Sequence, residues 1–551
     1  MDRGSRLRIA YSEMVLREYN RRFADWEAVV GRVEAAFAEP RAGQESTLRQ
    51  ILEAHASSAY GREHGFEGIR TWREYQERVP VVDYETLRPW VDRMVAGEAD
   101  VLVRGPASYF STTSGSTAAP KFIPGTQSTV RAGCQAILTR NALLRRDHPR
   151  AFEGRPLLIV GSMAEGTTPG GSTYGAMTGF GYHASHIGFP AQAFPHELFA
   201  LRDADARYYA ILRVALAARD VSLLASYNPS TLLRLLEAAD AWWDELVADV
   251  SAGTLTRRVD VPAPARESLA PWLVADRRRA DELRDVRQGG PRAWWPSLGL
   301  LMCWKGGAAG FYLGDLEARV GTLPVRELGL VASEAAVSVA VDDGVGGALL
   351  PESGFFEFVP EGHPASAAVP AWGLELHGRY RVLLTTMGGL YRYELGDVVR
   401  VIGYHQQTPR IEFLHRAGRV YSFTGEKLTE YQVTVAVRAA TESCGLRLAG
   451  FTAIPVWGRP PRYEVFLEPA VDVPPAAGER LAASIDAELC GVNMEYEGKR
   501  RSGRLGPIVA TALPRGSFER LRREHAGSDA QYKELHLAPD PSYRGRFGAA
   551  A

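Results

Sequence analysis

The residues best suited to chemistry begin with a hydroxyl-rich loop. The stretch Thr113–Lys121 reads Thr-Ser-Gly-Ser-Thr-Ala-Ala-Pro-Lys and follows the strand-like pair Tyr109-Phe110. Backbone N–H groups and hydroxyls of such a loop can point at phosphate oxygens, and the lysine adds a positive charge. The chain contains no Gly-Lys-Ser/Thr, so this is not a Walker loop. A solvated Ser/Thr/Gly turn has the same composition, and both interpretations stay open at this point.

A single carboxylate forms the second candidate. Glu334 ends the stretch Gly329–Glu334, directly after a short apolar run. Mg²⁺ is usually held by one or two carboxylates together with substrate phosphates, so a glutamate in this position can serve the ion. An ordinary surface glutamate at a strand end would have the same sequence.

The third candidate is the stretch Gly388–Asp397, which combines a Gly-Gly turn, the triplet Tyr-Arg-Tyr and a Gly-Asp step. Aromatic rings stack on flat groups, and one carboxylate can accept hydrogen bonds from both hydroxyls of a ribose. A β-hairpin whose turn is closed by Asp397 explains the same residues equally well. Further downstream stand the isolated cations Arg416, Lys427 and Lys533, and lone lysines are usually solvated.

Alternating strand and helix patterns must position these residues, which predicts an α/β fold. The pattern predicts one long helix over residues 11–59, and strands at Val101–Val103, Leu157–Val160, Leu223–Ala225 and Leu300–Cys303. The stretch 161–181 is rich in glycine and is expected to be a long loop, whereas 320–415 is rich in strands. We expect a large N-terminal domain over 1–415, a smaller α/β domain over 416–551, and a hinge near 415–419.

Composition excludes several classes of function. The 551 residues carry 64 Lys and Arg against 65 Asp and Glu, so no global positive field exists to attract nucleic acid or an anionic membrane. No apolar stretch approaches the ~20 residues that span a bilayer. The four cysteines form no C-x-x-C pair, and the charged N-terminus resembles no secretory signal. We expect a cytoplasmic protein without nucleic-acid or membrane partners and with an unknown oligomeric state.

Taken together, these motifs resemble the adenylate-forming superfamily, and more closely the Gretchen Hagen family of acyl-acid amido synthetases. The run Leu383–Tyr393 with Gly396–Val401 is similar to that family's signature, and Ala530–Lys533 resembles its terminal lysine motif. Trp304-Lys305-Gly306-Gly307 resembles the Gly-Gly loop of the superfamily. Two departures are Ala118, in place of a glycine of the phosphate loop, and Leu330, in place of an aromatic residue.

The resemblance implies a large adenylate-forming domain of mixed β-sheets and surrounding helices, followed by a small mobile α/β domain. It implies that ATP and Mg²⁺ activate a carboxylic acid as an acyl-adenylate, which an amine, typically an amino acid, then attacks. The implied nucleotide contacts are Thr113, Ser114, Gly115, Ser116, Thr117, Lys121, Gly306, Gly307, Ser333, Glu334, Tyr391, Arg392, Asp397 and Arg416.

Within this implied site, Glu334 would bind Mg²⁺ and Asp397 would take the ribose hydroxyls. Lys427 and Lys533 would assist adenylation at the α-phosphate, and Tyr227 and Trp304 would line the acyl pocket. Two alternatives remain at this stage. A thioester-forming ligase would pass the same adenylate to coenzyme A or a carrier protein, and a nucleotide-binding protein without turnover would use only part of these charges.

Overall fold

The computed structural model divides into two compact units. The first comprises residues 1–305, 312–395 and 399–413, and the second comprises 306–311, 396–398 and 414–551. The structure describes residues 17–113, 121–179, 187–201, 203–256, 261–416, 420–421, 426, 428–458, 460–471, 474–503, 505–524, 534–538 and 541–550. In these residues no helix is long and apolar enough to cross a membrane.

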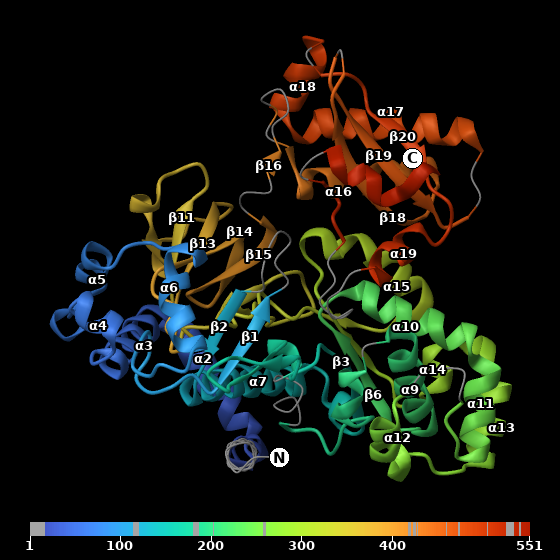
Figure 1. Cartoon of the computed structure of the whole chain (residues 1–551), viewed down its shortest axis with the longest axis horizontal. Coiled ribbons are helices and arrows are strands. Elements are labelled where there is room, and N and C mark those ends of the chain that lie inside the picture. Colours follow the sequence, from blue (N-terminus) through green and yellow to red (C-terminus); the bar gives the residue numbers. More distant parts are fainter. Residues whose placement is uncertain are drawn as a thin grey trace. The chain divides into compact units, whose positions relative to one another are not determined.

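A four-stranded parallel sheet lies in the first unit, in the order β3-β6-β7-β8. Its strands are β3 (Arg155–Ile159), β6 (Val221–Ser226), β7 (Leu300–Met302) and β8 (Val325–Arg326). Alternate residues of β6 face opposite sides: Leu224 packs in the core that contains α9, α10 and α11, and Leu223 packs in the core that contains α2 and α7. Burial on both faces explains why these strands are short, continuous apolar runs. Figure 1 shows β3 and β6 beside the helices α9 and α10.

Two further sheets belong largely to this unit. The four-stranded sheet β2-β1-β5-β4 contains β1 (Tyr109–Thr113), β2 (Lys121–Gly125), β4 (Gly166–Thr167) and β5 (Thr173–Gly175). The seven-stranded sheet β12-β11-β13-β14-β15-β10-β9 contains β9 (Ser338–Val339), β10 (Gly347–Leu349), β11 (Phe355–Pro360), β12 (Val369–Pro370), β13 (Arg379–Thr385), β14 (Tyr393–His405) and β15 (Thr408–Arg416).

Helices cover these sheets. The helices of the first unit are α2 (Trp26–Ala38), α3 (Pro40–His55), α4 (Ala59–Glu63), α5 (Trp72–Arg78), α6 (Tyr84–Val95), α7 (Gln127–Asp147), α9 (Ala204–Ala217), α10 (Pro229–Ala241), α11 (Trp243–Ala252), α12 (Ala263–Leu269), α13 (Arg277–Asp285), α14 (Pro291–Trp294) and α15 (Leu313–Val320). The helix expected over 11–59 is wrong as a single element, because Pro40 begins a new helix after Glu39. Residues Val101–Val103 are fully buried but form no strand.

The second unit has a core of its own, formed by one sheet and the helices on it. The sheet β18-β19-β20 consists of β18 (Leu448–Val456), β19 (Arg462–Pro469) and β20 (Val509–Ala512), and a separate pair consists of β16 (Val420–Tyr421) and β17 (Leu428–Thr429). Its helices are α16 (Glu430–Cys444), α17 (Pro475–Val492), α18 (Met494–Arg501) and α19 (Ser517–Arg523). The described residues of this unit therefore have the mixture of strands and helices that was expected beyond residue 416.

A buried ion pair joins α5 to the seven-stranded sheet. The guanidinium of Arg392 contacts the carboxylate of Glu357 on β11 at 3.0 Å and donates to the carbonyl oxygens of Gln76 and Val79. Only 1% of the Glu357 side chain is exposed, so its charge has no access to water. The pair must therefore form for this part of the core to fold.

Removing this cation is expected to destabilise the first unit strongly. The Arg392→Met substitution leaves the Glu357 carboxylate buried without its guanidinium and should cost about 3–5 kcal/mol, measured as a lower midpoint in thermal unfolding. The matched control is Arg379→Met on β13, whose pair with Glu361 lies at the surface and should contribute at most about 1 kcal/mol. Equal effects of the two substitutions would contradict the assignment.

Candidate functional site

The site is built at the carboxyl edge of the parallel sheet. Because β3, β6, β7 and β8 run in one direction, the residues that follow them meet at the same edge, which is where open α/β sheets bind ligands. Tyr227 follows β6, Trp304 follows β7, and the stretch Glu327–Glu334 follows β8. Four predicted site residues, Tyr227, Trp304, Ser333 and Glu334, therefore share one edge for a topological reason.

A cavity of about 150 Å³ lies at this edge. It brings together Tyr227, Ser333 and Glu334, which the sequence had placed in an acyl pocket and a nucleotide site. The rest of the lining is mostly apolar or small: Tyr109, Gly125, Thr129, Val130, Ala132, Gly133, Ala136, Ile137, Arg140, Met177, Leu328, Val331, Ala332, Ala335, Ala336, Ser338, Val339, Leu350, Ser353, Thr386, Met387 and Gly388. Such a lining suits a small apolar ligand with one or two polar groups.

One face of α7 forms a wall of the cavity. Val130, Gly133, Ile137 and Arg140 recur at the three- and four-residue spacing of a helix, so they share one side of α7. Among the described residues that line the cavity, Arg140 is the only cation. Its Nε donates to Oδ1 of Asn141 at 3.1 Å, and burial lowers the pKa of its guanidinium. Arg140 was not among the predicted site residues, because the side of α7 that borders the cavity is set by tertiary packing.

Trp304 packs against a residue of the cavity wall. It does not line the cavity but lies behind Tyr227, with the two ring centroids 5.3 Å apart. Its backbone N–H donates to the carbonyl oxygen of Tyr227, and its indole N–H donates to the carbonyl oxygen of Gly329. Trp304 thus supports the wall that Tyr227 provides. The assignment of Trp304 to the acyl pocket stays a prediction, in which Trp304 acts through Tyr227.

The two ends of the hydroxyl-rich loop are held together by strand pairing. Thr113, the last residue of β1, pairs with Lys121, the first residue of β2. The Lys121 ammonium lies 5.1 Å from the ring centroid of Tyr84. The other predicted residues of this loop, Ser114, Gly115, Ser116 and Thr117, lie outside the described residues, as do Lys427 and Lys533.

A tyrosine and an arginine of the stretch 388–397 have their side chains buried in the protein core. Tyr391 is fully buried, donates its hydroxyl hydrogen to the carbonyl oxygen of Leu102, and stacks on Tyr60. Burial raises the pKa of Tyr391 well above its usual value. Arg392 is likewise held by Glu357, so both side chains have partners within the protein, and their predicted contact with a nucleotide stays a prediction.

The turn of this signature requires a glycine. Gly389 has φ +89°, and a Cβ there would lie 2.9 Å from side-chain atoms of Leu102 and Val103. Asp397 lies within β14 and not in the turn, so the alternative in which it closes a hairpin turn is wrong.

Within the second unit, two predicted nucleotide contacts meet. Nε of Arg416 donates to Oδ1 of the buried Asp397 at 2.9 Å. Gly306 and Gly307 belong to the same unit, and Gly307 begins a short 3₁₀-helix. Glu426, the neighbour of Lys427 in sequence, is fully buried, and its carboxylate accepts a hydrogen bond from the Tyr463 hydroxyl.

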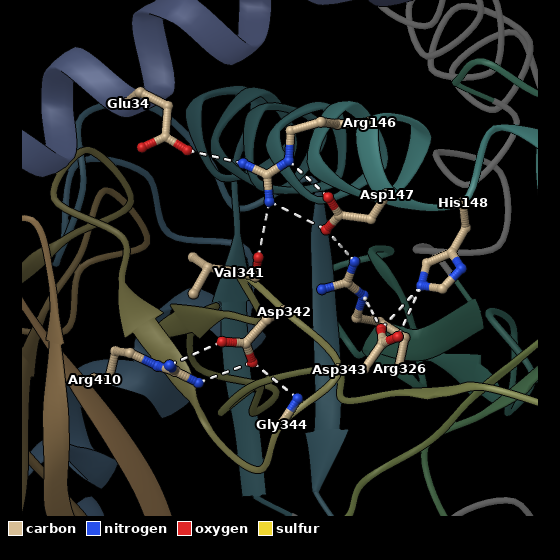
Figure 2. A network of polar contacts seen from close by, with 10 residues as sticks. All are labelled: Glu34, Arg146, Asp147, His148, Arg326, Val341, Asp342, Asp343, Gly344 and Arg410. Atoms are coloured by element: carbon tan, nitrogen blue, oxygen red, sulfur yellow. Dashed lines mark hydrogen bonds and ion pairs between the residues drawn. The ribbon is translucent and has the colours of Figure 1, made fainter.

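A polar network lies at the end of α7 and supports β8 (Figure 2). The buried guanidinium of Arg326 contacts the carboxylates of Asp147 and Asp343, and His148 also contacts Asp343 at 2.9 Å. The backbone oxygen of Asp343 accepts a hydrogen bond from the Lys305 ammonium at 2.6 Å. The network therefore links α7, the end of β8 and the segment that follows β7.

Models of protein families match most of the chain. The GH3 family N-terminal domain matches residues 29–325, more than half of the sequence, the central domain matches 347–416, and the C-terminal domain matches 431–542. The chain belongs to the GH3 family. This confirms the resemblance to the Gretchen Hagen family that the motifs indicated.

Curated relatives of this GH3 protein match over nearly its whole length. Jasmonoyl–L-amino acid synthetase JAR6 of Nicotiana attenuata is 26% identical over 94% of the chain and 93% of the relative. Indole-3-acetic acid-amido synthetase GH3.8 of Oryza sativa subsp. indica is 27% identical over 87% of the chain and 84% of the relative. The solved structure of AtGH3.15 acyl acid amido synthetase in complex with 2,4-DB has a TM-score of 0.86 at 22% identity and covers 96% of both chains. The predicted α/β fold is thereby confirmed.

The cavity wall offers a test through stability. A Cβ added to Gly133 on α7 meets no atom within 4 Å, so Gly133→Ala should stabilise the helix by about 0.5–1 kcal/mol and raise the unfolding midpoint. The contrasting substitution is Gly445→Ala at the end of α16, where φ is +65° and an alanine is strained. A lower midpoint for Gly133→Ala would show that the space beside α7 is filled.

Proposed function

We propose that this GH3 protein is an ATP-dependent acyl-acid amido synthetase that joins a carboxylic acid to an amino acid. The observation that carries the proposal is the cavity, because it offers an apolar lining, the guanidinium of Arg140, and Ser333 and Glu334. A carboxylic acid with a small apolar body has the matching chemistry, since its anion can pair with Arg140. The relatives named as amido synthetases support the same class of reaction.

The reaction proceeds in two transfers. A carboxylate oxygen of the acid attacks the α-phosphorus of ATP, the bond from that phosphorus to the bridging oxygen breaks, and pyrophosphate leaves. The amine nitrogen then attacks the carbonyl carbon of the acyl-adenylate, the bond to the phosphate oxygen breaks, AMP leaves, and the amine loses a proton. The protein's part is to hold two anions close together in the right orientation, which is costly without cations.

Magnesium fits the residues present. Glu334 is buried and lines the cavity, whereas the described residues contain no group of three His, Cys, Asp or Glu that could hold a metal alone. One carboxylate together with phosphate oxygens is a usual set of Mg²⁺ ligands. When bound, the ion would neutralise charge on the phosphates of ATP. In our proposal Glu334 holds it, and Ser333 lies beside the α-phosphate.

The remaining roles belong to groups that bind the nucleotide. In our proposal the loop from Ser114 to Thr117, with Lys121, cradles the β- and γ-phosphates through backbone N–H groups and hydroxyls. Asp397 accepts the ribose hydroxyls, and Arg416 is its neighbouring cation. Lys427 and Lys533 neutralise the α-phosphate while charge shifts during adenylation.

Pyrophosphate exchange tests the proposed first transfer. With a panel of aryl, indolyl and fatty acids, exchange of labelled pyrophosphate into ATP should depend on one class of acid. Asp397→Ala should raise the KM for ATP sharply, because the ribose loses its acceptor. Near-normal ATP kinetics in that variant would overturn the ribose assignment.

Mass spectrometry with mixed amino acids or coenzyme A then separates amide from thioester products. ATP binding without any exchange would favour a protein that only binds nucleotide.

The cation of the cavity gives a second test. Arg140→Ala should raise the KM for the acid by about tenfold to a hundredfold, the value of a charge-assisted hydrogen bond of about 1.5–3 kcal/mol, and leave the KM for ATP nearly unchanged. Arg140→Lys keeps the charge and should recover part of the loss. The matched control is Arg145→Ala, which removes a cation from the same helix outside the cavity lining. An unchanged KM for the acid in Arg140→Ala would place the acid elsewhere.

A further inference from the structure

We propose that Glu327 is a positioning residue whose buried carboxylate, by accepting three backbone N–H groups, holds the segments after β7 and β8 against the cavity. The inference rests on the proposed function in one respect, since it takes the cavity to be the acid site. No motif of the sequence pointed to Glu327, which stands directly after β8.

The geometry around the carboxylate is well defined. Oε2 accepts from the backbone N–H of Lys305 at 2.7 Å, and Oε1 accepts from Leu328 N–H at 2.9 Å and Gly329 N–H at 3.3 Å. Only 3% of Glu327 is exposed. One side chain therefore satisfies donors from two neighbouring strand ends.

These bonds continue directly into the cavity wall. Leu328 lines the cavity, and the carbonyl oxygen of Gly329 accepts the indole N–H of Trp304. Trp304 in turn donates its backbone N–H to Tyr227 and packs on the ring of Tyr227, which also lines the cavity. Releasing the Glu327 carboxylate would loosen Leu328 and Tyr227 together. Lys305 also leads in sequence into Gly306 and Gly307, the proposed nucleotide loop.

The role requires a carboxylate and not merely a polar group of the same size. A glutamine offers one acceptor oxygen and two N–H donors, so its amide nitrogen would face at least one backbone N–H. A protonated glutamate loses an acceptor in the same way. The substitution Glu327→Gln therefore removes the positioning interaction while almost preserving the volume of the side chain.

The groups around Glu327 leave its charge only partly compensated. The Lys305 ammonium is directed to the carbonyl oxygens of Val325 and Asp343, the thiol of Cys303 lies beside the carboxyl, and the cation of Arg326 is held by Asp147 and Asp343. Burial raises the pKa of Glu327 to about 7, against the lowering effect of the three N–H groups and Lys305. The positioning form is consequently lost as the pH falls through about 7.

Folding and positioning respond to this proton in opposite directions. The pKa of Glu327 is higher in the folded chain than in the unfolded chain, so its contribution to stability is present at low pH and is lost as the pH rises through about 7. A merely structural role would make activity follow stability. The positioning role predicts that activity falls with decreasing pH while this contribution to stability grows.

The decisive experiment compares the full chain with Glu327→Gln from pH 5.5 to 8.5. At pH 8, Glu327→Gln should lower kcat/KM for the acid in pyrophosphate exchange by about tenfold to a hundredfold, mainly through KM for the acid. The acid limb of the wild-type profile, with its midpoint near 7, should flatten in the variant. The matched control is Glu317→Gln on α15, an exposed glutamate outside the cavity, which should keep both the rate and the limb.

A second readout needs no turnover. The indole N–H of Trp304 donates to the carbonyl oxygen of Gly329, whose own N–H donates to Glu327. The fluorescence of Trp304 should therefore change when Glu327 takes up a proton. This Trp304 component is the signal of the wild type minus that of Trp304→Phe. The component should have a midpoint near 7 and be absent in Glu327→Gln. If no acid supports exchange, the proposed function fails while this fluorescence still decides the inference. A wild-type acid limb in Glu327→Gln, or an unchanged Trp304 component, would overturn it.

Discussion

The direction of the backbone hydrogen bonds in one small sheet governs the site. Because β3, β6, β7 and β8 are parallel and both faces of the sheet are covered, polar groups can reach a ligand only at the strand ends. At the carboxyl edge, polar groups of neighbouring strand ends form hydrogen bonds with one another. The backbone N–H of Trp304 bonds to Tyr227, that of Cys303 to Arg326, and that of Lys305 to Glu327. These hydrogen bonds join the ends of neighbouring strands beside the cavity.

Burial has opposite effects on the two kinds of charge beside the cavity. It lowers the pKa of Arg140 and raises the pKa of Glu327, because both ions lose contact with water. Glu327 is compensated by backbone N–H groups of its own chain. Arg140 has the neutral amide of Asn141 as its described partner, and a neutral acceptor leaves the positive charge uncompensated. An anionic ligand would compensate this charge, which in our proposal is a physical reason for a carboxylic acid to bind beside Arg140.

Much of this arrangement was readable in the sequence, and the exceptions have identifiable causes. Apolar runs between turn residues predicted β3, β6 and β7, whereas the position of Glu334 after such a run left open an ordinary surface glutamate, and only the family resemblance implied a site there. The type of a residue does not reveal which way its side chain points in the fold, however. Tyr391 and Arg392 have side chains suited to a nucleotide, yet their partners Leu102 and Glu357 are distant in sequence, and only the tertiary fold reveals that both side chains face the core. Arg140 was missed for the converse reason, since the side of α7 that borders the cavity depends on packing.

In our proposal one carboxylate, that of Asp397, serves both the ion pair with Arg416 and the ribose hydroxyls. Asp397 is buried, whereas 43% of the Arg416 side chain is exposed, so water stabilises the guanidinium but not the carboxylate when they separate. In our proposal a ribose diol donates two hydrogen bonds to Asp397 and so replaces the hydrogen bond lost from Arg416. Arg416 would then be available to an anion such as a phosphate. In this exchange of partners the guanidinium gains water and the carboxylate gains the ribose hydroxyls, so each group receives a new partner. This requires the exposed member of the pair to be the cation.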